Sequence, residues 1–166
     1  MTHTHPARRS TTALTVSSIV LIILSIPALA YEVRGAIDGA TNSTAALAVG
    51  ASCVSALVGL VFLAWLARFT PSILSWIAAF TWGTGGALLI AGIGNGVTDA
   101  AMETSISDAQ TADVVTSVVT GTLIEETAKG IGALILILAA RKVLQRPAQG
   151  AVLGGLVGLG FAWGED

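Results

Sequence analysis

The chain has 166 residues, of which 54% are hydrophobic and only 11% are charged, and its mean hydropathy is +0.82. Soluble domains carry a charged fraction of roughly 25%, so this composition excludes an ordinary water-soluble fold. The net charge of −2 carries no signature of nucleic-acid binding. Because the apolar residues stand in long blocks, the sequence predicts an all-α bundle of transmembrane helices in the lipid bilayer.

Five apolar segments follow one another along the chain, and we predict each to be a membrane span: residues 14–31, 44–66, 72–94, 114–140 and 148–166. A span needs about 20 apolar residues, so four are full spans and the fifth ends with the chain. Residues 1–13 are polar and basic, which predicts a disordered cytoplasmic tail before the transmembrane domain of residues 14–166. A cleaved signal peptide is the alternative for the first segment, but its apolar block is long for one and further spans follow.

The basic residues indicate the orientation, because cytoplasmic loops are enriched in Lys and Arg. With the N-terminus inside, six of the eight basic residues lie on the cytoplasmic side: Arg8, Arg9, Arg68, Arg141, Lys142 and Arg146. The opposite orientation would reverse this distribution. The sequence therefore predicts a multi-pass protein of the cell membrane with a cytoplasmic N-terminus.

Charged residues interrupt the fourth predicted span, and such residues usually mark functional sites because they are costly in lipid. Lys129 follows Glu125 by four residues and Glu126 by three, so its ammonium group can reach either carboxylate. Two acids and one base leave a surplus negative charge, and a low-dielectric setting disfavours two ionised carboxylates side by side. A carboxyl that exchanges a proton near neutral pH is what general acid–base catalysis requires.

Glu165 places a further carboxyl in the fifth span. On a helical wheel it shares a face with Gly154 and Gly158, a small-residue spacing that predicts close packing against the fourth span. At 1.5 Å per residue, Glu125 and Glu165 lie roughly 24 and 28 Å from the basic turn at 141–147. The two carboxyls are therefore predicted to lie at similar depth, in the outer half of the bilayer.

The run Glu125-Glu126-x-x-Lys129, followed one hairpin later by Gly160-Phe161-Ala162-x-x-Glu165, resembles the first two motifs of the PrsW-type intramembrane proteases. This family is related to the CAAX-protease and bacteriocin-processing group, and the resemblance covers about residues 114–166. It implies an endopeptidase that uses glutamate-activated water to hydrolyse a peptide bond of a membrane-anchored substrate near the outer side of the bilayer. By the same resemblance, the substrate is a single-span membrane protein similar to an anti-sigma factor.

The resemblance also implies roles for the four charged residues. Glu125 and Glu126 would be the base and its partner, Lys129 would pair with them or tune them, and Glu165 would complete the polar site. A divalent metal such as zinc, held by these three glutamates, and metal-free catalysis are both compatible with the sequence.

The chain departs from the family pattern at its C-terminal end. The family has a third motif with an essential histidine in a later span, whereas His3 and His5 are the only histidines here and lie in the tail. Asp166 stands where the family usually has Asn. We therefore expect a C-terminally truncated chain that is inactive on its own.

Two other functions fit the same charged residues. A transporter or proton relay would also place Glu and Lys inside the membrane, although no inverted repeat or pair of broken helices is evident. An inactive structural fragment would use the cluster only to fix helix packing. The tryptophans Trp82 and Trp163 are interpreted as interface anchors near the ends of spans.

The distribution of basic residues predicts the topology. Reporter fusions after Arg9 and Arg146 should score cytoplasmic, and fusions after Asp38 and Asp108 should score external. A cytoplasmic score at Asp108 would contradict this topology.

Overall fold

The computed structural model describes residues 6–39, 43–67, 72–105, 108, 111 and 114–165, which form helices and no strand. The all-α prediction is therefore confirmed for these residues. His3, His5, Arg68, Asp113 and Asp166 lie outside them. The elements are α1 (Pro6–Gly39), α2 (Ser43–Ala67), α3 (Ile73–Thr81), the π-helix η1 (Trp82–Ala87), α4 (Leu88–Ser105), the π-helix η2 (Val115–Gly121), α6 (Thr122–Ala140) and α7 (Pro147–Glu165).

Two helical segments are long and apolar enough to cross a membrane: Thr11–Tyr31 in α1 and Ile73–Met102, which runs through α3, η1 and α4. The apolar part of α2, Gly50–Leu66, is shorter. Charged residues interrupt α6 near its start, and α7 is rich in glycine. The structure thus supports two candidate spans among the described residues and does not establish the four full spans that the sequence predicts.

Two helices extend well beyond the apolar segments from which they were predicted. α1 has 34 residues: it begins at Pro6, inside the predicted tail of residues 1–13, and continues to Gly39, beyond the predicted span of residues 14–31. The helix that contains residues 72–94 continues to Ser105. Apolar length predicts which part of a helix suits the hydrocarbon, but backbone hydrogen bonding can continue through polar residues outside it.

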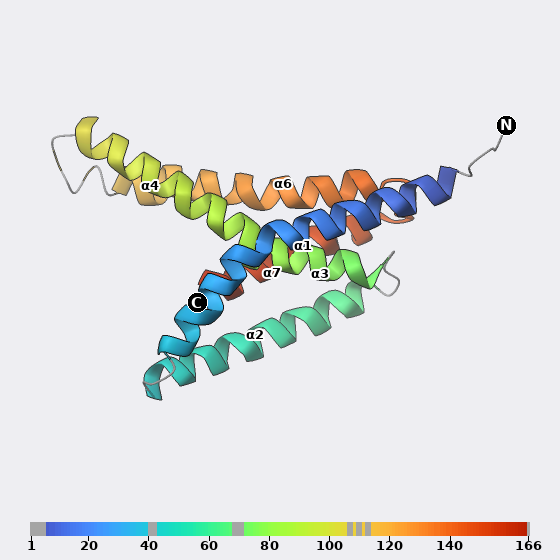
Figure 1. Cartoon of the computed structure of the whole chain (residues 1–166), viewed down its shortest axis with the longest axis horizontal. Helices are drawn as coiled ribbons and strands as arrows, with labels where there is room; N and C mark the ends of the chain where they lie inside the picture. Colours follow the sequence, from blue (N-terminus) through green and yellow to red (C-terminus); the bar gives the residue numbers. More distant parts are fainter. Residues whose placement is uncertain are drawn as a thin grey trace.

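The helical segments α1, α2, α3–η1–α4, α6 and α7 run in alternating directions (Figure 1). The start of α1, the end of α2 and the end of α6 lie at one end of the molecule, on the right of the view. The end of α1, the start of α2 and the end of α4 lie toward the other end. Among the described residues, the basic segments at the start of α1 and in the turn after α6 therefore belong to the same end.

The centre of the molecule is η1, which packs against α1, α6 and α7. All six of its residues are buried. Glycines allow the close approach to α7: a Cβ on Gly83 would overlap the Val157 carbonyl oxygen, and a Cβ on Gly160 would overlap the Phe80 carbonyl oxygen. The two backbones therefore touch directly, because neither glycine places a side chain between them.

The glycine face that the sequence predicts for α7 is wrong. A Cβ added at Gly154 or Gly158 would meet no heavy atom within 4 Å. Close contacts of α7 are instead made through Gly160, which faces Phe80 at the end of α3 and Thr84 of η1, and through Gly155, which faces Leu63 of α2. A helical wheel gives the direction of each residue, but it does not give the direction of the neighbouring helix.

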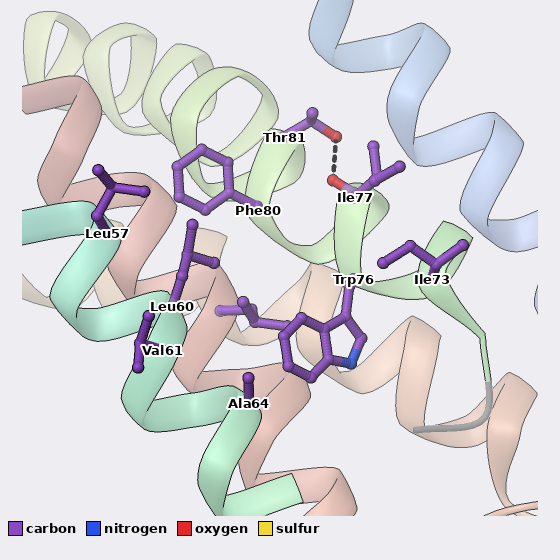
Figure 2. Close-up of a pocket in the computed structure, with 10 residues that line it drawn as sticks. Leu57, Leu60, Val61, Ala64, Ile73, Trp76, Ile77, Phe80 and Thr81 are labelled. Atoms are coloured by element: carbon purple, nitrogen blue, oxygen red, sulfur yellow. Dashed lines mark hydrogen bonds between the residues drawn. The ribbon is translucent and has the colours of Figure 1, made fainter. Parts of the chain in front are cut away.

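The helix α2 lies at the edge of the bundle (Figure 1) and is mostly exposed. Apart from Ala56, its described residues are exposed or half-buried, and many of the exposed ones are large and apolar. An apolar pocket of about 500 Å³ lies between α2 and α3, lined by Leu57, Trp76, Phe80 and their neighbours together with Leu156 of α7 (Figure 2). None of the charged residues of the predicted site lines this pocket.

The glycine contacts predict which substitutions will destabilise the bundle. Gly83→Ala and Gly160→Ala should each lower the free energy of unfolding by about 1–3 kcal/mol, because the added methyl group meets a backbone oxygen that no rotamer change can move. Thermal unfolding of the protein in detergent micelles would measure the loss. Gly154→Ala is the matched control and should be neutral or slightly stabilising, so equal damage at all three positions would contradict the assignment.

Candidate active site

Three of the four charged residues of the predicted site, Glu125, Glu126 and Lys129, lie in the first turns of α6, and Glu165 is the last residue of α7. Lys129 donates a hydrogen bond to Glu126, with 2.7 Å between Nζ and Oε1. The Glu126 side chain is 66% exposed and the Lys129 side chain is 20% exposed. Glu125 is half-buried. Of the two carboxylates that the spacing places within reach of Lys129, the structure thus pairs it with Glu126.

The same lysine joins α6 to α7. Its Nζ atom lies 4.0 Å from the centroid of the Phe161 ring, which is 1% exposed. A cation over an aromatic face is attracted by the ring quadrupole, and the interaction is worth about 0.5–2 kcal/mol. Phe161 belongs to the segment of residues 160–165, so Lys129 connects the two motifs that the sequence singles out.

The carboxyls of Glu125 and Glu165 lie at one level of the α6–α7 hairpin. Lys129 contacts Phe161, and further along the hairpin an added Cβ on Gly150 would lie 3.9 Å from Ile137. These two pairs fix an antiparallel register. Glu125 lies four residues before Lys129, and Glu165 lies four residues after Phe161, so each is about 6 Å further along its helix in the same direction.

Trp82 in η1 contacts the first motif segment, although it lies far from that segment in the sequence. Its Nε1–H donates a 3.1 Å hydrogen bond to the carbonyl oxygen of Ala128, the residue before Lys129. The indole is 5% exposed and fits against Gly132, where any Cβ would overlap the ring. The interpretation of Trp82 as an interface anchor is therefore wrong, because the side chain is buried inside the bundle and paired there.

Thr84, two residues further along η1, holds the second motif. Its hydroxyl lies 3.0 Å from the carbonyl oxygen of Gly160 and 3.0 Å from that of Phe80, so its single hydrogen is shared between them. Thr84 is completely buried. One short π-helix thus contacts both motif segments through polar side chains.

Trp82 and Thr84 are not identified as part of the site by the sequence pattern. The available signal was the run Trp82–Ala87, in which a threonine and three glycines interrupt an apolar span. Glycines in a span indicate close packing, but nothing in their spacing says which helix is approached. Trp163 is half-buried and lies against Phe80, with 6.0 Å between ring centroids.

Metal ligands are sparse in the part of the chain that the structure describes. No three His, Cys, Asp or Glu side chains there gather closely enough to hold a metal ion. Glu125, Glu126 and Glu165 are all among these residues, so in this arrangement the three carboxylates do not make a metal site by themselves.

Comparison with known protein families gives one match. Residues 71–166 match the family described as PrsW family intramembrane metalloprotease. The matched region begins just before α3 and includes η1, α6 and α7, so it contains every residue of the contacts described above. Searches of curated proteins and of solved structures found no match.

The contact between Lys129 and Phe161 predicts an energetic coupling between the motifs. In a double-mutant cycle with Lys129→Met and Phe161→Leu, the coupling energy in unfolding should be about 0.5–2 kcal/mol. Thermal unfolding of the four proteins in micelles measures it. Replacing Phe161→Leu by Phe62→Leu provides the control, since Phe62 contacts Trp65 in α2, and that cycle should show no coupling. A zero coupling for Phe161 would contradict the contact.

Proposed function

Because this chain belongs to the PrsW family of intramembrane metalloproteases, we propose that it acts as an endopeptidase that cleaves single-span membrane proteins within or beside the bilayer. The observation that carries this proposal is the junction of the two motifs at Lys129, which pairs with Glu126 on its own helix and lies over Phe161 on the next. The junction sets Glu125 and Glu165 at one level of the hairpin.

We assign the role of general base to Glu125. The Glu126 carboxylate is already engaged by the Lys129 ammonium group, whereas Glu125 lies half-buried on the same turn. The Glu125 carboxylate would accept a proton from a water molecule while the water oxygen attacks the carbonyl carbon of the scissile bond. The same carboxyl would return the proton to the leaving nitrogen as the C–N bond breaks.

The family's description as metalloproteases implies a metal, which would act as a Lewis acid toward the carbonyl or lower the pKa of a bound water. The described residues alone do not fit such a metal, because no three ligands gather among them. Glu126 is assigned as the partner of Glu125 in proton transfer, Lys129 orients Glu126 through the ion pair, and Glu165 completes the polar site from α7.

The substrate we propose is a single-span protein of the anti-sigma-factor kind, in keeping with the sequence resemblance. With the N-terminus cytoplasmic, the level of Glu125 and Glu165 lies toward the outer side of the membrane. Cleavage is then expected toward the outer end of the substrate's membrane segment.

Glutamine substitutions test the chemistry, because an amide cannot accept the proton of the attacking water. In the protein expressed in membranes, Glu125→Gln should lower the cleavage rate of a single-span reporter by at least about 100-fold. Glu126→Gln should also remove nearly all cleavage, Glu165→Gln should impair it, and Lys129→Ala should be milder. Gel analysis of the reporter and its fragments measures the rate.

A matched acidic control is Asp99→Asn, which removes an exposed carboxylate of α4 outside the motif segments and should leave cleavage unchanged. Normal cleavage by the double variant Glu125→Gln/Glu126→Gln would remove the protease mechanism and favour the transport or packing alternatives. Absence of cleavage by the wild-type protein across a panel of single-span reporters would overturn the proposed activity.

A further inference from the structure

We infer that Trp82 and Thr84 are positioning residues of the proteolytic site: their side chains set the height and rotation of α6 relative to α7 by binding a backbone carbonyl in each motif segment. This inference rests on the proposed function for its effect on cleavage. Its structural part, the mutual placement of the two segments, can be tested without activity.

Three contacts, together with the chain itself, form a closed circuit across three helices. Trp82 donates to the carbonyl of Ala128, which adjoins Lys129, and Lys129 lies over Phe161. Phe161 adjoins Gly160, whose carbonyl accepts from Thr84, and Thr84 lies two residues from Trp82. Each motif segment is therefore held at its backbone by η1, and the two segments are held to each other by one cation–π contact.

The surroundings make these contacts specific. Gly83 and Gly85 of η1 lie so close to the carbonyl oxygens of Val157 and Ser25 that a Cβ at either position would overlap them, which leaves no room for a side chain between these helices. Both donors are buried, and a buried donor left without an acceptor is costly. A shift of α6 would take the acceptor from Trp82, and a shift of α7 would leave the Thr84 hydroxyl only the Phe80 carbonyl, which precedes it along the same helical segment. This arrangement favours one relative position of the carboxyls of Glu125 and Glu165.

Matched controls lie in α3, the helix that directly precedes η1. Trp76 is a half-buried tryptophan whose Nε1 atom has no hydrogen-bond partner among the described residues. The Thr81 hydroxyl donates to Ile77, 2.8 Å away, and so stays within its own helix (Figure 2). These residues carry the same functional groups as Trp82 and Thr84 but do not connect α3 or η1 to a motif segment.

The activity test compares variants that delete only the polar group. In the protein expressed in membranes, Trp82→Phe and Thr84→Val should each lower kcat by about ten- to a hundredfold, since small displacements of reacting groups reduce rates by this order. KM should change little, because neither side chain lies with the exposed carboxylates where substrate arrives. Thr84→Ser should restore most of the rate, and Trp76→Phe and Thr81→Val should retain it.

The second readout is the coupling between Lys129 and Phe161 in unfolding of the chain of residues 1–166. It should fall by at least half in the Trp82→Phe and Thr84→Val backgrounds and stay unchanged in the Trp76→Phe and Thr81→Val backgrounds. Unchanged coupling in all four backgrounds overturns the inference whether or not the protein cleaves. If Glu125→Gln abolishes cleavage while Trp82→Phe and Thr84→Val cleave normally, the proposed function stands and the positioning role is refuted.

Discussion

The approach of η1 to α7 at backbone contact is the constraint on which the rest of the structure depends. Gly83 and Gly160 permit it, and any side chain at either position would separate the helices. At that distance the Thr84 hydroxyl reaches the carbonyl of Gly160. The same helical segment turns the Trp82 indole to α6, where Gly132 leaves room for it. Inside an apolar environment, hydrogen bonds to backbone carbonyls and small-residue packing stabilise helix contacts that the hydrophobic effect does not drive.

The charged residues depend on this scaffold more than on one another. Lys129 contacts the Glu126 carboxylate on its own helix α6 and the Phe161 ring on α7, so its position depends on the distance between the two helices. Glu126 takes up the lysine's charge, and Glu125 is left half-buried beside it. The division of the two neighbouring glutamates into a paired and an available carboxylate follows from the choice of Lys129 between its i−3 and i−4 partners.

The sequence predicts the helical class, the two motif segments and their common level along the hairpin. These follow from apolar length, from the cost of charge in lipid and from the rise of a helix, all of which are local properties. The predictions that depend on the position of a neighbouring helix are wrong. No described heavy atom lies within 4 Å of a Cβ added at Gly154 or Gly158, and Trp82 is buried inside the bundle and does not lie at an interface. For the same reason the sequence does not determine which acid pairs with Lys129. The spacing allows both Glu125 and Glu126, and the packing selects Glu126.

The π-helical geometry of η1 has a consequence for how relatives of this chain should be aligned. A π turn closes its hydrogen bonds over five residues instead of four, so it holds one residue more than the α-turn it replaces. That extra residue rotates everything beyond it by about 100° around the axis. A relative with a regular helix here would therefore show a one-residue gap inside residues 82–87, in the middle of a hydrophobic segment where insertions are rarely sought. Such a gap would mark the position at which the bulge arose. The faces of α4 would match those of the relative only after the gap is introduced into the alignment.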